Sequence, residues 1–228
     1  MVNYLIPTRI SGRTLQPTSA EEVRPRPLKR VFDAVSSAVL LVLLAPVLLV
    51  VVVLIRATSP GPALFRQARV GQGEKTFTIL KFRTMYVGCS DELHQSYVRS
   101  LLSGEPVGSC GELFKLADDP RVTRVGAWLR RSSLDELPQL INVLRGDMSL
   151  VGPRPVLPFE AEMFDGEQRL RFGVRPGLTG LWQVSGRSRI GFLEQLAIDA
   201  RYVRDQSGML DLKILFRTVP ALLLRRTR

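Results

Sequence analysis

Two adjacent carboxylates, Asp135 and Glu136, are the residues of this sequence best suited to phosphate chemistry. Adjacent side chains point in different directions, so one carboxylate could attack a phosphorus atom while its neighbour held Mg²⁺. Both follow a pair of serines, and a helix start there would favour a bound phosphate. Four arginines precede the pair and could offset that phosphate's charge: Arg121, Arg124, Arg130 and Arg131. The plainer alternative is a capping box, in which Ser132 or Ser133 and one carboxylate cap a helix.

Two loops rich in proline and glycine could present arginines to a phosphate. The first loop, 151–155, carries Arg154 between two prolines. A guanidinium held by a stiff backbone can bind two phosphate oxygens at once. The second loop, 175–180, leads to Trp182 and Arg187, which together could hold a nucleotide by stacking and phosphate contact. The alternative in both places is a rigid turn with a solvated arginine.

The composition indicates an anionic partner and leaves nucleophilic or acid–base work to carboxylates. The 228 residues carry a formal net charge of +11, which fits nucleic acid, anionic lipid or a phosphorylated substrate. Cys89 and Cys110 fit no metal spacing and are expected as free thiols in a reducing cytosol. The single histidine, His94, cannot build a His-rich metal site.

An uncharged apolar run, 35–55, is long enough to cross a bilayer core of about 30 Å as a straight helix. Pro46 lies at its midpoint and removes a backbone donor, so the helix should bend or break there. Basic residues flank the run on both sides, although they normally mark only the cytoplasmic end. A re-entrant hairpin that dips into one leaflet satisfies both flanks. A kinked single span remains the alternative.

The elements around these motifs are predicted to be mainly helical. Partial alternation on both sides of Gly71-Gln72-Gly73 predicts a β-hairpin of residues 63–70 and 75–85. Helical periodicity marks three segments: 122–129, 134–144 and 192–202. The stretch 210–224 is apolar with a basic end, typical of a helix at an anionic membrane surface or of a core helix with a solvated tail. Residues 1–27 predict a flexible tail.

Taken together, these motifs resemble the bacterial sugar transferase family, the monotopic polyprenyl-phosphate phosphoglycosyl transferases. The resemblance covers residues 29–224, and so many motifs in one order make coincidence implausible. The motifs are Lys-Arg-x-Phe-Asp (29–33), the apolar run with its central proline, Lys-Phe-Arg-Thr-Met (81–85), Ser-Leu-Asp-Glu-Leu-Pro-Gln-Leu (133–140), Gly-Asp-Met-Ser-Leu-Val-Gly-Pro-Arg-Pro (146–155) and Arg-Pro-Gly-Leu-Thr-Gly (175–180).

The resemblance implies a fold that is mixed, mainly α with a small β-hairpin, in a monotopic membrane protein. Residues 28–58 would form a re-entrant helix broken at Pro46, although Ala45 stands where many relatives have serine. Residues 59–228 would form a catalytic domain with interfacial helices on the cytoplasmic face of the bacterial inner membrane. Larger relatives carry additional membrane helices before this module, so the chain is either a short form or a piece of a longer one.

The resemblance also implies a two-step reaction. The aspartate matching Asp135 attacks the β-phosphate of a UDP-sugar and expels UMP, and undecaprenyl phosphate then takes the phosphosugar from the enzyme. The glutamate matching Glu136 is associated with Mg²⁺. Four further positions match residues that support the active site: Lys81, Arg130, Arg154 and Asp211. Asp211 could instead cap the last helix. The 180–187 loop looks more like that of galactose- or glucose-phosphate transferases.

Two other functions compete with this one. A basic membrane-bound adaptor would recruit partners without chemistry, but it would have no need of adjacent carboxylates beside arginines. A Mg²⁺-dependent lipid phosphatase would not release UMP from a UDP-sugar. Binding of nucleic acid is disfavoured because the basic residues flank apolar segments and no nucleic-acid module is recognised. A homodimer is a possible assembly, and the sequence does not fix the sugar.

Overall fold

The computed structural model describes residues 26–88, 119–185 and 191–223. The expected tail within 1–25 and four named residues lie outside these ranges: Arg187, His94, Cys89 and Cys110. In the described part helices predominate, and the strands form two small two-stranded sheets. The predicted class, mainly helical with a small antiparallel hairpin, is therefore confirmed.

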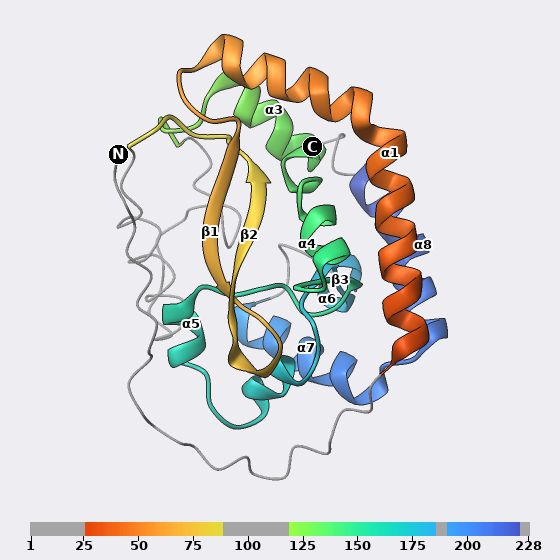
Figure 1. Cartoon of the computed structure of the whole chain (residues 1–228). Coiled ribbons are helices and arrows are strands. Elements are labelled where there is room, and N and C mark those ends of the chain that lie inside the picture. Colours follow the sequence, from red (N-terminus) through yellow and green to blue (C-terminus); the bar gives the residue numbers. More distant parts are fainter. Residues whose placement is uncertain (1–25, 89–118, 186–190, 224–228) are drawn as a thin grey trace.

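The apolar run forms a single helix, α1, from Pro27 to Thr58. Pro27 occupies the start of the helix, where the missing N–H of proline costs nothing. Pro46 lies inside α1 without interrupting it, and Figure 1 shows the helix changing direction near its middle. The expected break is thus a bend, because one proline removes a single donor while the neighbouring hydrogen bonds continue the helix.

Most of the surface of α1 is not covered by the rest of the chain. Large apolar side chains along it are exposed, among them Phe32, Leu43 and Leu49. Within the residues that the structure describes, α1 is the one helix long and apolar enough to cross a membrane. The fold is therefore that of a domain with a protruding apolar helix, and the re-entrant course of that helix stays a prediction.

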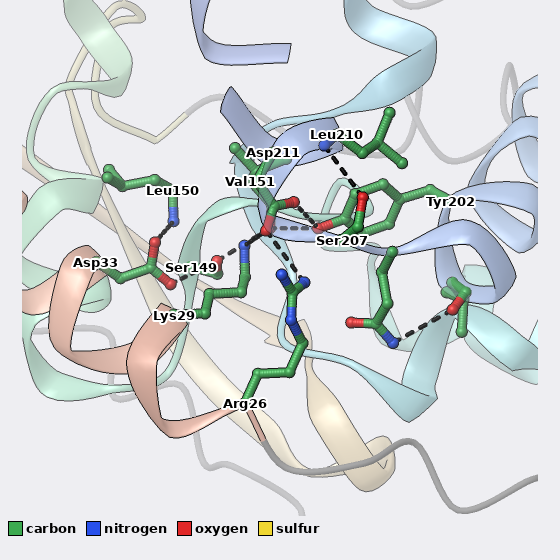
Figure 2. A network of polar contacts seen from close by, with 12 residues as sticks. Arg26, Lys29, Asp33, Ser149, Leu150, Val151, Tyr202, Ser207, Leu210 and Asp211 are labelled. Carbon is green, nitrogen blue, oxygen red and sulfur yellow. Dashed lines mark hydrogen bonds and ion pairs between the residues drawn. The ribbon is translucent and has the colours of Figure 1, made fainter. Parts of the chain in front are cut away.

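One narrow face of α1 is buried against the rest of the domain, and it carries polar groups. The carboxylate of Asp33 is buried and accepts hydrogen bonds from Ser149 Oγ at 2.7 Å and from the backbone N–H of Leu150 at 3.3 Å (Figure 2). Arg30 donates to the carbonyls of Val143 and Leu144, at 2.6 and 2.7 Å. These carbonyls end a helix, where a cation complements the helix dipole.

The predicted hairpin is confirmed. Strand β1 (Leu64–Val70) pairs antiparallel with β2 (Thr76–Phe82), and the turn η1 (Gln72–Glu74) connects them. The register sets Phe65 opposite Lys81 and Arg69 opposite Phe77. Because directly opposite residues share a face and residues two apart along a strand do too, Arg69 and Lys81 lie on the same face of the hairpin.

The segment that carries the carboxylate pair is a short turn between two helices. Helix α3 (Arg124–Ser132) ends at Ser133, which adopts a left-handed conformation with φ of 57°. The 3₁₀ turn η2 (Leu134–Glu136) follows, and α4 (Gln139–Arg145) begins after Pro138. The single helix expected over 134–144 is therefore wrong. Pro138, which has no N–H, divides the segment, and the left-handed Ser133 separates it from α3.

The expected capping box is also absent from this segment. Ser132 Oγ bonds back to the carbonyls of Trp128 and Leu129 within α3, at 2.9 and 3.1 Å. The side chain of Ser133 does not cap η2. Neither serine therefore forms a capping box with Asp135 or Glu136, and the interpretation of these residues as a helix cap is wrong.

A second sheet holds the two proline–glycine loops together. Strand β3 (Ser149–Val151) runs parallel to β4 (Gly177–Thr179). A Cβ on Gly177 would lie 2.1 Å from the backbone N of Gly152, and a Cβ on Gly152 would lie 2.4 Å from the carbonyl oxygen of Arg175. Only glycine at both positions allows this approach. The sequence did not predict the pair, because strands of three residues are too short for a periodic signal.

The remaining elements complete a core around α4. They are α5 (Pro158–Glu162), η3 (Gly166–Gly173), α6 (Leu181–Ser185), α7 (Phe192–Asp205) and α8 (Gly208–Leu223). One buried cluster joins β2, α4, β3, α7 and α8 through residues such as Ile79, Leu140 and Tyr202. A second contains Phe164, Phe172 and Phe192. Figure 1 shows α4 between the hairpin and α1, so the core lies directly beneath the apolar helix.

Candidate active site

Glu136 joins two predicted cations that come from distant parts of the chain. Its Oε1 accepts a hydrogen bond from Arg154, with an NH2 distance of 3.1 Å, and lies 3.5 Å from Lys81 Nζ. Lys81 comes from β2, Glu136 from η2, and Arg154 from the loop after β3. The Arg154 side chain is 38% exposed. The three residues thus form one ionic cluster that a substrate can reach from solvent.

Asp135 shares the turn with Glu136, and its charge acts on three cations. Burial lowers the pKa of Lys81 to about 8, and the negative charges of Glu136 and Asp135 oppose that shift. Burial likewise lowers the pKa of Arg130, against the field of Asp135. Glu136 raises the pKa of Arg154, with a smaller contribution from Asp135. The carboxylate of Asp135 therefore lies within electrostatic reach of all three predicted basic residues.

Arg130 reaches this site because α3 packs tightly on the end of β2. Its Nε donates to Thr84 Oγ1 at 2.9 Å. A Cβ on Gly126 would lie 2.0 Å from the Thr84 carbonyl oxygen, so glycine is what lets α3 approach that backbone. Thr123 fixes the start of α3, because its Oγ1 accepts from the Gly126 N–H at 2.9 Å. Packing and a cap together fix the position of Arg130.

Arg69 belongs to the same site, and the sequence analysis did not assign it. It donates from NH1 to the Pro155 carbonyl at 3.3 Å, next to Arg154 in the loop. Its positive charge also contributes to the lowered pKa of Lys81, after burial and the charge of Arg154. The register of the hairpin was the signal that could have found it, because the turn at 71–73 sets Arg69 and Lys81 on one face.

The charges of the site suit a substrate with more than one phosphate. Two carboxylates face four cationic side chains: Lys81, Arg130, Arg154 and Arg69. Asp119 and Glu160 balance part of this positive charge, since they act on Arg130 and Arg154, and the remainder is available to an anionic substrate. A diphosphate would neutralise it, and arginine forks are suited to phosphate oxygens.

Asp211 lies in a different cluster from the carboxylate pair. Figure 2 shows its carboxylate accepting hydrogen bonds from Arg26 at 3.1 Å, Lys29 at 2.9 Å and the Tyr202 hydroxyl at 2.7 Å. Its side chain therefore does not cap α8, which was the alternative for this residue. Lys29 and Tyr202 also donate to the carbonyl of Val151, each at 3.1 Å. Asp211 thus touches the site only indirectly, through the strand that leads to Arg154.

The donor set at Asp135 and Glu136 fits the protein half of a Mg²⁺ site. Mg²⁺ is usually held by one or two carboxylates together with substrate phosphates and water, rather than by a cage of protein ligands. Across 26–88, 119–185 and 191–223 there is no group of three or more His, Cys, Asp or Glu residues placed to hold a metal. Two adjacent carboxylates beside a phosphate-binding surface match the first arrangement and not the second.

An apolar helix joined to paired carboxylates among arginines fits a membrane-associated enzyme that acts on phosphates. The chain belongs to the bacterial sugar transferase family, whose profile matches residues 24–225. Its place in a family of sugar transferases makes it an enzyme. The family resemblance drawn from the motifs is thereby confirmed.

Individual relatives are similar over most of this chain. It is 42% identical over 198 residues to the exopolysaccharide production protein ExoY of Rhizobium meliloti, covering 87% of this chain and 86% of that protein. It is 45% identical over 203 residues to the UDP-glucose:undecaprenyl-phosphate glucose-1-phosphate transferase of Caulobacter vibrioides, covering 86% and 69%. It is 40% identical over 201 residues to the undecaprenyl-phosphate galactose phosphotransferase of Salmonella typhimurium, covering 87% of this chain and 41% of that protein.

Proposed function

We propose that this enzyme transfers a hexose-1-phosphate from a UDP-hexose to undecaprenyl phosphate, as the first membrane step of exopolysaccharide, capsule or O-antigen synthesis. The observation that carries the proposal is the cluster in which Glu136 contacts Lys81 and Arg154 while Asp135 occupies the same turn. The names of the relatives from Caulobacter and Salmonella support the donor and the acceptor. Both substrates carry phosphate, which suits the cationic side chains of the site.

In the first step the Asp135 carboxylate acts as the nucleophile. One of its oxygens forms a bond to the β-phosphorus of the UDP-sugar, and the bond from that phosphorus to the bridging oxygen breaks. The bridging oxygen keeps the electron pair and leaves with the α-phosphate as UMP. An acyl phosphate then links the sugar-1-phosphate to Asp135. No proton has to move, because the attacking and leaving groups are both anions. Lys81, Arg130 and Arg154 offset the charge that gathers at phosphorus.

In the second step undecaprenyl phosphate takes the sugar-1-phosphate from Asp135. One of its phosphate oxygens bonds to the same phosphorus, and the bond to Asp135 breaks. The products are undecaprenyl diphosphate sugar and the free Asp135 carboxylate. When Mg²⁺ is bound, Glu136 would hold it together with the donor's phosphates, and it would neutralise negative charge there. Arg154 keeps its contact with Glu136 in both steps and thereby holds the loop 151–155 in place.

The membrane arrangement is part of the proposal. Helix α1 enters the inner membrane from the cytoplasmic face, reverses at the bend and returns to the same face. Helix α8 lies at the cytoplasmic surface of the membrane. Four apolar side chains spaced along α8 are exposed: Met209, Leu212, Phe216 and Val219. Their spacing of three to four residues puts them on one face, as in an interfacial helix. The ion pair between Lys29 and Asp211 joins the beginnings of the two helices, so both can meet one lipid surface.

The test is a single-turnover assay without the lipid acceptor. Purified enzyme in nanodiscs receives UDP-glucose or UDP-galactose with Mg²⁺, and UMP is measured. A two-step mechanism releases about one UMP per active site and then stops. Intact-protein mass spectrometry should show one added hexose phosphate, which maps to the peptide containing Asp135. Asp135→Asn should abolish both signals. Asp205→Asn, which alters an aspartate paired with Arg201 at the surface, should abolish neither.

Two outcomes would overturn parts of this proposal. If UMP appears only when undecaprenyl phosphate is present and no adduct forms, transfer is direct and Asp135 is not the nucleophile. If undecaprenyl phosphate is hydrolysed and no UMP is released from any UDP-sugar, the enzyme is a lipid phosphatase. Glu136→Gln should lower the rate and shift the Mg²⁺ requirement to higher concentrations, because its expected part is in holding the metal.

A further inference from the structure

Arg171 and Asp199 form an ion pair in the interior of the domain, away from the carboxylate pair. Arg171 lies in η3 and Asp199 in α7, and the distance from NH2 to Oδ2 is 3.0 Å. The two side chains are 6% and 2% exposed. The Arg171 guanidinium also lies 5.3 Å from the centre of the Phe164 ring, which holds it from a second side.

The same nitrogen of Arg171 also contacts the loop 151–155, which carries Arg154. Its NH2 donates a hydrogen bond to the backbone carbonyl oxygen of Arg154 at 2.7 Å. The side chain of Arg154 extends from that peptide to Glu136, at 3.1 Å. A continuous series of polar contacts therefore runs from Asp199 through Arg171 and the backbone of Arg154 to Glu136.

Burial disfavours the charged form of both members of this pair. Burial raises the pKa of Asp199 to about 6, although Arg171 opposes the shift. Burial also lowers the pKa of Arg171, although Asp199 and Glu160 oppose that shift. Asp199 Oδ1 is buried and has no hydrogen-bond partner among the residues that the structure describes. Buried ion pairs of this kind can often be replaced by apolar residues without loss of stability. Stability alone therefore does not account for the pair.

We propose that Arg171, held by Asp199, is a positioning residue that fixes the Arg154 peptide so that the Arg154 guanidinium meets the substrate's phosphate. The inference rests on the proposed function, because it names a support for that same site. The side chain of Arg154 is partly exposed and has several rotatable bonds. The region that its guanidinium can reach therefore depends on the position of the peptide from which it extends. Arg171 acts on that peptide and touches no reacting atom.

The test replaces the buried pair by apolar residues of similar size. In Arg171→Met/Asp199→Leu no buried charge is left alone, and the donor to the Arg154 carbonyl is gone. A matched control exists, because Arg204 and Glu167 form an exposed ion pair between the same two elements, α7 and η3. Arg204→Met/Glu167→Leu therefore makes the same chemical change without touching Arg154. Arg171→Lys is a milder variant, since it keeps the charge but replaces the planar guanidinium, which contacts Asp199, the Arg154 carbonyl and the Phe164 ring, by a compact ammonium.

The readout combines kinetics with a double-mutant cycle. Arg171→Met/Asp199→Leu should lower kcat/KM for the UDP-sugar by roughly 10- to 100-fold, as displacement of a positioning group does. Its thermal midpoint in detergent should remain within a few degrees of the wild type, and the control pair should keep its activity. In an Arg154→Gln background the same double substitution should lower kcat/KM by less than about twofold, because its effect passes through Arg154.

Each result decides the question. Equal losses with and without Arg154 would mean that the pair braces the fold in general, and the positioning role would be wrong. Unchanged kcat/KM in both Arg171→Met/Asp199→Leu and Arg171→Lys would also overturn it. If the wild type releases no UMP from any UDP-sugar, the proposed function fails instead. The pair is then judged by the affinity for UDP measured by titration calorimetry, which should fall in the double variant and not in the control.

Discussion

Asp33 in α1 accepts a hydrogen bond from Ser149 in β3 at 2.7 Å, although it lies on a helix that is otherwise apolar along most of its length. The strand that contains Ser149 leads directly to the loop of Arg154. The buried carboxylate of Asp33 therefore joins the apolar helix α1 to the loop 151–155, which carries Arg154. A helix held only by apolar contacts could rotate or slide against the domain, and this hydrogen bond helps to fix its position together with the contacts of Arg30 and Lys29.

Loss of that bond should be measurable as a coupling between the two residues. Asp33→Ala and Ser149→Ala should each lower the free energy of unfolding by about 1–3 kcal/mol, because each removes one partner of a buried hydrogen bond. The double variant should cost clearly less than the two single losses together. Denaturant titration in detergent micelles measures all three. Strict additivity would show that the two residues do not stabilise each other.

Arg69 should contribute to binding of the donor. Arg69→Gln removes a positive charge from the site and the donor to the Pro155 carbonyl, so KM for the UDP-sugar should rise by roughly tenfold, with a smaller change in kcat. Arg66 provides the control, because it is exposed and three residues away on the same strand, so it faces the other way. Arg66→Gln makes the same change in net charge. Similar KM values in the two variants would exclude a specific part for Arg69.

The stability of the domain should depend on pH through Asp199. Its pKa in the folded protein, about 6, lies above the ordinary value of 3.8, so the folded state holds this proton more tightly than the unfolded chain. The stabilisation from the bound proton is full below about pH 4 and is lost as the pH rises through about 6. It amounts to at most about 3 kcal/mol, since each pKa unit corresponds to about 1.4 kcal/mol.

Comparison with the apolar pair isolates this contribution from other groups. The wild type should gain stability relative to Arg171→Met/Asp199→Leu when the pH is lowered from 7.5 to 5. Arg171 is the charged group that acts on Asp199, and Glu160 in turn acts on Arg171. Calorimetry at the two pH values gives the difference. A difference that is the same at both would mean that Asp199 does not titrate there.

The bend in α1 should determine on which side of the membrane its ends lie. Single cysteines at positions Ala20 and Ala63, in a variant without Cys89 and Cys110, should both be shielded from an impermeant thiol reagent added outside intact cells. Pro46→Leu restores the missing backbone donor, so it should straighten the helix and expose one end. Labelling of one end in the protein with Pro46 intact would show a kinked span instead.

The sequence predicted the parts of this structure that depend on local patterns. The alternation around Gly71 and Gly73 was enough for the hairpin, and the apolar run was enough for α1. The periodicity of 134–144 was misleading, because Pro138 divides the segment into a turn and a shorter helix. Periodicity records which face is buried, and a 3₁₀ turn followed by an α-helix can bury the same face.

The sequence predicted which residues gather at the site better than it predicted the contacts that they make. Lys81, Glu136 and Arg154 meet as expected, and Arg130 stands within the field of Asp135. Asp211 proved to contact α1 and Tyr202, because a motif match assigns a residue to a family position without naming its neighbours. The pair of Arg171 and Asp199 could not be foreseen, since only the packing of η3 on α7 brings the two together.

The polar and apolar contacts of α1 also limit how this enzyme can be prepared. A catalytic fragment cut after residue 58 would lose Val51 and Ile55, which cover Phe82 and Leu129. It would also leave the last carbonyls of α4 without Arg30, and Asp211 without Lys29. Removing the hydrophobic segment is a common route to a water-soluble domain, but here it would open the core of that domain. The intact chain must therefore be extracted with detergent or polymer, and fragments lacking α1 should aggregate.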